Sequence, residues 1–266
     1  MKKEYFDMFD KLWNEISALP EVTAIALGGS RSGNEYDEKS DYDLYVYITS
    51  VPEEERRKQL LSEYCCYMEI GNSFWELEDD CTLKNGIDID ILYRDLQSFS
   101  QGVAGVVEQG NAGTGYTTCM WHNLKTCKIL YDEEGLLAKA KERFDVDYPP
   151  ILKENIISKN LKLLHGMLPS YDGQIKKAMD RNDLVSVNHR VTAFMESYFD
   201  IIFAMNELTH PGEKRQVEYA EKYASVLPDH FKENICELYH AMFGDFERAE
   251  GIINQIYAEL IKILKL

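Results

Sequence analysis

The sequence predicts an α+β fold in two parts, a mixed β-sheet domain over residues 1–147 followed by an all-helical bundle over residues 148–266. Strand-like runs rich in valine, isoleucine and tyrosine occur only in the first part, whereas helical periodicity dominates the second. Tyr148-Pro149-Pro150 marks the boundary, because consecutive prolines favour a break between elements. Segregation of strands from helices is typical of α+β proteins or of separate domains.

Local signals predict each element in turn. Apolar residues at helical spacing predict a first helix, which Pro20 ends, and β-branched or aromatic runs predict strands. Helices in the first part are expected over residues 4–19, 52–64, 95–109, 117–125 and 133–144. Strands are expected over residues 22–27, 41–49, 65–70, 87–93 and 127–131. Six helices are expected in the second part, over residues 151–167, 171–180, 184–208, 213–226, 230–243 and 246–265.

Composition excludes several classes of protein. The chain has 266 residues with 29 Lys and Arg against 46 Asp and Glu, a formal charge of −17 that disfavours a large nucleic acid as partner. No run approaches the length of a transmembrane helix, and residues 1–9 lack the apolar region of a secretory signal, so we expect no membrane association. The six cysteines form no C-x-x-C pair, which favours reduced thiols in a cytoplasmic protein.

Aspartates gather on two of the predicted strands. Alternation places Asp41 and Asp43 on one face of the strand over 41–49, and Asp88 and Asp90 on one face of the strand over 87–93. If these strands are neighbours, about 4.8 Å apart, up to four carboxylates share one sheet surface. Clustered carboxylates suit Mg²⁺ and a phosphoryl displacement. The alternative is a pair of amphipathic strands with solvated aspartates.

A glycine turn precedes the first acidic strand. Gly28-Gly29-Ser30 ends the run over 22–27, and glycine lets the backbone approach a ligand closely. Amide groups there, with the Ser30 hydroxyl, can hold a triphosphate, and Arg31 can add a phosphate contact.

These elements carry a resemblance in their order and spacing. Gly29-Ser30, ten intervening residues, Asp41-Tyr42-Asp43 and a later strand with Asp90 resemble the signature of the DNA polymerase beta-like nucleotidyltransferase superfamily. The whole chain is similar to small bacterial nucleotidyltransferases with a helical C-terminal domain, the group of aminoglycoside and lincosamide nucleotidyltransferases. The resemblance implies that residues 1–147 form the nucleotidyltransferase domain and residues 148–266 the helical C-terminal domain.

The resemblance also implies roles for individual residues. Asp41 and Asp43 would hold Mg²⁺ and the nucleotide phosphates, and Asp90 would bind metal or accept the proton of the acceptor hydroxyl. Leu92-Tyr93-Arg94 after Asp90 favours it over Asp88, although an exchange of roles between these two acids stays open. Lys214 would contact the triphosphate as C-terminal-domain lysines do in similar enzymes; the alternative is an ordinary exposed basic pair with Arg215.

The function expected is Mg²⁺-dependent transfer of a nucleoside monophosphate from a nucleoside triphosphate to a hydroxyl of a small molecule. An aminoglycoside or lincosamide antibiotic is the suggested acceptor, which would make the chain an antibiotic-resistance enzyme. Two alternatives are a protein-modifying enzyme, of the adenylylating or antitoxin type, and an inactive nucleotide-binding module. The sequence leaves the nucleotide and the oligomeric state open.

Two further segments have simple structural interpretations. The acidic run of Glu76, Glu78, Asp79 and Asp80 is most simply a solvated face, with binding of a cationic acceptor as the alternative. The glycine-rich segment 110–115 is interpreted as a flexible loop bordering the cleft, because a P-loop needs lysine where Tyr116 stands.

Overall fold

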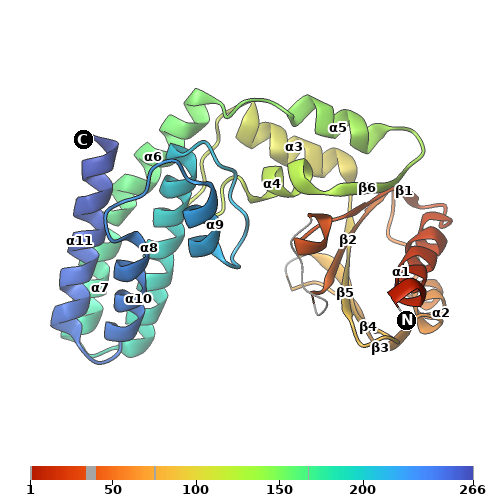
Figure 1. The fold of residues 1–266 in the computed structure, drawn as a ribbon, viewed down its shortest axis with the longest axis horizontal. Helices are drawn as coiled ribbons and strands as arrows, with labels where there is room; N and C mark the ends of the chain where they lie inside the picture. Colours follow the sequence, from red (N-terminus) through yellow and green to blue (C-terminus); the bar gives the residue numbers. More distant parts are fainter. Residues whose placement is uncertain (1, 34–39, 75, 167, 266) are drawn as a thin grey trace. The chain divides into compact units, whose positions relative to one another are not determined.

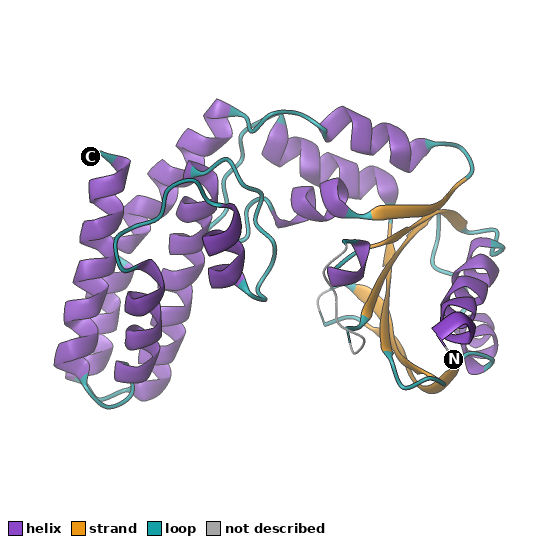
Figure 2. Cartoon of the chain, viewed as in Figure 1, coloured by secondary structure: helices purple, strands orange, loops and turns teal. Residues whose placement is uncertain are grey.

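The computed structural model describes residues 2–33, 40–74, 76–166 and 168–265, and it divides into two compact units (Figures 1 and 2). The first comprises Met1–Ala104 and Asn123–Asp145, and the second comprises Gly105–His122 and Val146–Leu266. A six-stranded sheet with helices forms in the first and helices dominate the second, so the α+β class is confirmed. The domain boundary after residue 147 stays a prediction, because the units are defined by packing alone and residues 105–122 pack with the second.

The sheet is mixed and its strands lie in the order β3-β4-β5-β2-β1-β6. Strands β2 and β5 are parallel, whereas the other neighbours are antiparallel. The strands are β1 (Val22–Leu27), β2 (Tyr42–Ile48), β3 (Cys65–Asn72), β4 (Leu77–Leu83), β5 (Asp88–Arg94) and β6 (Lys128–Asp132). Five of them were predicted within about two residues; β4 was not.

One face of the sheet packs under α1 (Lys2–Ser17) and α2 (Glu54–Ser62), which Figure 1 shows side by side. Leu44, Val46 and Ile48 of β2 point into this core, as the alternation predicted, and Ile89 and Ile91 of β5 join them. The helices contribute the buried side chains of Phe9, Leu12, Ile16 and Leu61. Each such side chain contributes about 1.5–3 kcal/mol when it is removed from water. This apolar layer therefore fixes the position of β2 and β5.

The remaining helices of the chain follow its predicted periodicity. They are α3 (Leu96–Val107), α4 (Cys119–Thr126), α5 (Leu136–Phe144), α6 (Pro150–Leu164), α7 (Tyr171–Asp180), α8 (Leu184–Met205), α9 (Gln216–Tyr223), α10 (Phe231–Ala241) and α11 (Phe246–Leu264), with the three-residue turn η1 (Ser30–Ser32) between β1 and β2. Within the described residues, no helix is both long and apolar enough to cross a membrane.

Helix α8 forms the centre of the second unit. The Asp183 side chain accepts a hydrogen bond from the Ser186 amide at 3.1 Å and so caps its first turn. Further along, Phe194, Tyr198 and Ile202 are almost completely buried against the neighbouring helices. Side chains of α6 fix the glycine-rich loop: Asn155 Nδ2 donates to the Gly110 carbonyl at 2.8 Å and Lys159 Nζ to the Ala112 carbonyl at 2.5 Å. These hydrogen bonds connect the loop with α6, while its flexibility remains a prediction.

Candidate active site

The first unit brings two of the predicted aspartates into register. Asp43 of β2 lies opposite Asp90 of β5 in the parallel pair, so the two strands are neighbours as the sequence suggested. Because side chains alternate along a strand, both carboxylates share the sheet face opposite the α1 and α2 core. Asp41 immediately precedes the first residue of β2 and has the same parity as Asp43.

Asp88 and Asp80 have different surroundings. Asp88 is exposed, and its carboxylate accepts a hydrogen bond from Thr82 Oγ1 at 2.8 Å. Asp80 lies directly opposite Asp90 in the antiparallel pair of β4 and β5 and accepts from Asn72 Nδ2 at 2.7 Å. Asp90 is therefore the acid of β5 that stands between carboxylates of two neighbouring strands.

Like charges shape the electrostatics of this face. The pKa of Asp90 is raised to about 6, first by burial and then by the carboxylates of Asp43, Asp80, Asp41 and Glu78 in that order of importance. The pKa of Glu78 is also raised, first by burial and then by Asp80 and Glu76. Such crowding favours either a proton or a bound cation on the cluster.

The glycine turn lies directly against Asp43. Gly28 donates its amide hydrogen to the Asp43 carbonyl at 2.8 Å. Gly29 has a φ of +56°, and a Cβ placed on it would lie 1.7 Å from Asp43 Oδ2. Gly28 is equally restricted, since a Cβ there would lie 2.3 Å from Cζ of Tyr45. Only glycine at both positions allows the turn to approach the acidic strand this closely.

The residues after the turn form η1. Ser30 begins this short 3₁₀ turn and is exposed, and Ser32 Oγ donates to the Gly29 carbonyl at 2.8 Å. Arg31 Nε donates to the carbonyls of Ser40 and Asp41 at 2.7 and 3.1 Å, and its guanidinium lies 4.1 Å from the centroid of the Tyr42 ring. The structure thus gives Arg31 a role in holding the start of β2, while its contact with phosphate remains a prediction.

The acidic face suits Mg²⁺ in its chemistry. Among the described residues, no three side chains of His, Cys, Asp or Glu converge as a complete cage for a metal ion. Mg²⁺ does not require one, since it is usually held by one or two carboxylates together with substrate phosphates and water. Asp43 and Asp90 lie in register, and burial and the neighbouring carboxylates raise the pKa of Asp90, which fits that mode of binding.

Lys214 lies in the second unit, in the turn before α9. This turn is held locally: the Gly212 amide donates to His210 Nδ1 at 3.1 Å, and the His210 amide donates to Thr118 Oγ1 at 2.8 Å. The ring of His210 is buried, which lowers its pKa to about 3, so it accepts this bond as a neutral imidazole. A role of Lys214 toward phosphate remains a prediction.

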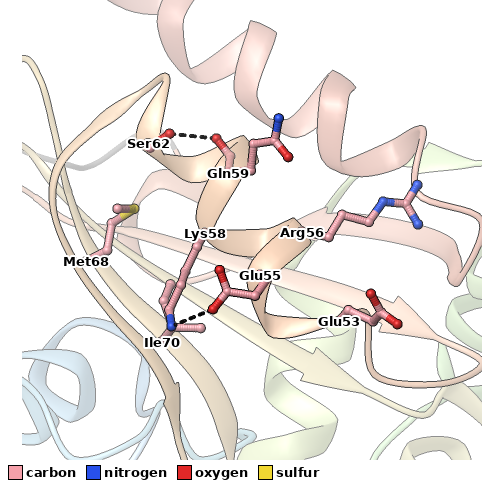
Figure 3. A pocket seen from close by; sticks show the side chains of 8 residues that line it. All are labelled: Glu53, Glu55, Arg56, Lys58, Gln59, Ser62, Met68 and Ile70. Carbon is pink, nitrogen blue, oxygen red and sulfur yellow. Dashed lines mark hydrogen bonds and ion pairs between the residues drawn. The ribbon is translucent and has the colours of Figure 1, made fainter.

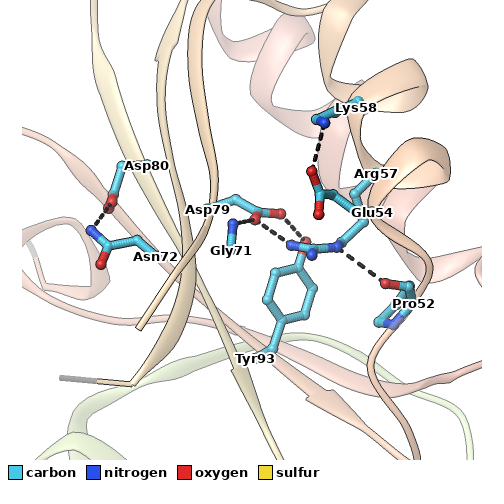
Figure 4. Close-up of polar contacts among 9 residues, drawn as sticks. All are labelled: Pro52, Glu54, Arg57, Lys58, Gly71, Asn72, Asp79, Asp80 and Tyr93. Carbon is cyan, nitrogen blue, oxygen red and sulfur yellow. Dashed lines mark hydrogen bonds and ion pairs between the residues drawn. The ribbon is translucent and has the colours of Figure 1, made fainter. Parts of the chain in front are cut away.

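Sequence reasoning missed strand β4 and with it part of the site. Glu78, Asp80 and Thr82 point to the acidic face, whereas Asp79 points to the opposite face and is completely buried. There it pairs with Arg57 and accepts from the Tyr93 hydroxyl at 2.9 Å and from the Gly71 amide at 2.8 Å (Figure 4). The charge on Asp79 concealed the apolar alternation of Leu77, Cys81 and Leu83, so the run was interpreted as a solvated face, which is wrong for Asp79.

A hollow of about 750 Å³ lies between α2 and β3 (Figure 3). Its floor is formed by Met68 and Ile70, which pair with Cys81 and Asp79 and therefore share their face of the sheet. Charged and polar side chains of α2 and the residue preceding it form its rim: Glu53, Glu55, Arg56, Lys58, Gln59 and Ser62. It is on the other face from Asp43 and Asp90, so it is not part of the acidic site.

Comparison with protein families agrees with the geometry. Residues 9–96, which include β1, the glycine turn, β2 and β5, match the family described as "Nucleotidyltransferase domain". Residues 117–215 match a family described as "Domain of unknown function (DUF4037)". A comparison with curated proteins gave no significant match.

Several solved structures are similar to the chain at low sequence identity. A nucleotidyltransferase-like protein from Exiguobacterium sibiricum 255-15 is 12% identical, with 97% of this chain and 74% of that chain covered and a TM-score of 0.43. An aminoglycoside 6-adenyltransferase from Bacillus subtilis is 11% identical, with 97% and 90% covered and a TM-score of 0.31. A spectinomycin adenyltransferase from Enterococcus faecialis, with ATP and spectinomycin, is 13% identical, with 97% and 98% covered and a TM-score of 0.33.

Proposed function

Because residues 9–96 form a nucleotidyltransferase domain, we propose that this enzyme uses Asp41, Asp43 and Asp90 to transfer a nucleoside monophosphate from a nucleoside triphosphate to a hydroxyl of a small acceptor. The observation that carries the assignment of these residues is the register of Asp43 with Asp90, directly beside a glycine turn that no larger residue permits. The proposed location is the cytoplasm.

The glycine turn and the aspartates are proposed to bind different parts of the metal–nucleotide complex. Amide groups of Gly29 and Ser30, with the Ser30 hydroxyl, bind the triphosphate, and Arg31 and Lys214 are proposed to add positive charge toward it. Asp41, Asp43 and Asp90 would hold Mg²⁺, which supplies positive charge to the phosphate oxygens when it is bound. The acids thereby fix the nucleotide above β2 and β5.

The reaction makes one bond and breaks another. The acceptor oxygen forms a bond to the α-phosphorus, the bond between that phosphorus and the bridging oxygen of pyrophosphate breaks, and pyrophosphate leaves. Asp90 accepts the hydroxyl proton, a step that general-base catalysis typically accelerates by roughly 10²–10⁴-fold. Without a bound metal, burial and the neighbouring carboxylates raise the pKa of Asp90 to about 6, and a raised pKa makes a carboxylate a stronger base.

The acceptor is proposed to be a cationic small molecule, such as an aminoglycoside or a lincosamide, with antibiotic resistance as the consequence. The support is electrostatic: Glu78 and Asp80 extend the acidic face beside Asp90, and the chain has a net charge of −17. An acidic face concentrates cationic ligands near the reacting groups.

A pyrophosphate-release screen tests the proposal. Each of the four nucleoside triphosphates would be combined with Mg²⁺ and a panel of aminoglycosides, lincosamides and uncharged polyols, and labelled protein acceptors would be tested in parallel. We expect acceptor-dependent release that Asp43→Asn lowers by roughly 10³-fold or more without unfolding the protein, because the phosphates lose a carboxylate-bound cation. Near-normal transfer by Asp43→Asn would contradict the site, and labelling of proteins alone would contradict the small acceptor.

A further inference from the structure

A buried arginine lies on the same sheet face as the acids. Arg94 ends β5 opposite Tyr47, and its Nε donates to Glu76 Oε2 at 2.6 Å. It is 8% exposed, and its Nη1 has no hydrogen-bond partner among the described residues; the same holds for the buried hydroxyl of Tyr47. Burial of a charge that is only partly paired costs stability.

The contacts of Arg94 lead to the glycine turn. Its guanidinium carbon lies 4.1 Å from the centroid of the Tyr45 ring and 5.2 Å from that of Phe99 in α3. Another neighbour of the Tyr45 ring is Gly28, where a Cβ would lie 2.3 Å from Tyr45 Cζ. Tyr45 is thus held between the guanidinium and the backbone of the turn, and it is too buried, at 5% exposed, to stack on a nucleobase.

We propose that Arg94, anchored by Glu76, is a positioning residue for the phosphate-binding turn. Its planar guanidinium fixes the Tyr45 ring by stacking, and the ring supports Gly28 and Gly29 against Asp43. Arg94 thereby sets the place of the turn amides relative to the acidic site. This inference rests on the proposed function, because it assigns the turn to the triphosphate.

The opposite face of the sheet contains a matched control. Arg57 is also buried, pairs with Asp79, donates from Nε to the Pro52 carbonyl at 3.2 Å and lies 5.1 Å from the centroid of the Tyr93 ring (Figure 4). Both arginines therefore combine burial, a carboxylate and a tyrosine ring. They differ in that the tyrosine beside Arg94 also lies against the turn, whereas Arg57 contacts Asp79 of β4, Tyr93 of β5 and Pro52 before α2.

Hydrogen exchange separates positioning from stability. Arg94→Met and Arg57→Met are both expected to lower Tm. Only Arg94→Met is expected to accelerate exchange in residues 28–33, by roughly tenfold or more relative to the core amides of β2 and β5 in the same variant. Equal protection of residues 28–33 in the two variants would overturn the proposal. Glu76→Gln weakens the ion pair with Arg94 but keeps a hydrogen-bond acceptor, so it should accelerate exchange in residues 28–33 less than Arg94→Met does. It replaces Arg94→Met in the experiment if that variant does not fold.

Kinetics then connect the turn with the nucleotide. Arg94→Met is expected to raise KM for the nucleoside triphosphate by roughly 10–100-fold with a smaller change in kcat, since misplaced binding groups lose affinity. Arg94→Lys keeps the charge but not the planar stack, so its KM should lie between those of the wild type and Arg94→Met. Arg57→Met should leave KM unchanged. An unchanged KM in Arg94→Met would also overturn the proposal. A wild-type enzyme without transfer activity would refute the proposed function, while exchange still decides the role of Arg94.

Discussion

The two faces of the central sheet differ in how their buried and half-buried carboxylates are surrounded. On one face Asp79 is completely buried, yet it has Arg57, Tyr93 and Gly71 as partners, and the surrounding side chains are apolar. On the other face Asp90 stands between Asp43 and Asp80, and both of these carboxylates raise its pKa.

This difference separates stabilising charge from functional charge. A buried carboxylate that is fully paired maintains the fold, whereas carboxylates crowded together oppose it and persist where a cation or proton is needed. Neighbouring residues of β4 show the contrast directly, since Asp79 and Asp80 differ by one position and point to opposite faces.

The largest effect is expected from Asp79→Asn. Removing the charge leaves Arg57 buried without its ion pair, which should lower the free energy of unfolding by roughly 3–5 kcal/mol. Asp80→Asn is the matched control and should change it by less than about 1 kcal/mol. Chemical denaturation measures the free energy of unfolding of each variant. Equal losses of this free energy in Asp79→Asn and Asp80→Asn would contradict the distinction between the two faces.

A smaller effect, on activity, is expected from Gly29→Ala. Its Cβ would collide with Asp43 Oδ2 and force a φ of +56° on alanine, so kcat/KM should fall by about 100-fold through displacement of the turn. Gly33→Ala is the control, because its nearest neighbour would be the Ser30 carbonyl at 3.8 Å and its φ is −95°. Similar kcat/KM values for both variants would show that the close approach of turn and acid is not needed.

The smallest effect is a gain of stability in Asp90→Asn. The pKa of Asp90 is about 6 in the folded chain and about 3.9 in an unfolded one. Ionisation of Asp90 therefore lowers the free energy of unfolding by its full amount above about pH 6, and it has no effect below about pH 4, where the group is protonated in both states. Asn removes that penalty, and thermal unfolding should show a gain on the order of 1 kcal/mol near pH 8 that disappears near pH 4. A loss of stability at about pH 8 would show that Asp90 supports the fold. Transfer activity should be lost in the same variant.

Much of the site could be predicted because strand alternation is a local property. The spacing of Asp41 and Asp43, the isoleucines around Asp90 and the glycines before Ser30 indicate one acidic face and a close turn without knowledge of the neighbours. Strand β4 could not be predicted in this way, since Asp79 interrupts its apolar face and its partner Arg57 lies 22 residues earlier. Arg94 was equally hidden, because its position in β5 shows neither the Tyr45 stack nor the ion pair with Glu76.

The sequence by itself determined the two-part α+β organisation, the inward side chains of β2 and β5, and the need for glycine before the acidic strand. Periodicity and backbone freedom are carried by consecutive residues, so they can be recognised from the chain alone. Only the tertiary structure decided that β2 and β5 run parallel with Asp43 opposite Asp90, that Asp80 joins them from β4, and that Arg94 stacks on the ring of Tyr45. Pairing and stacking join residues distant in sequence, and the packing of the whole sheet selects which of them meet.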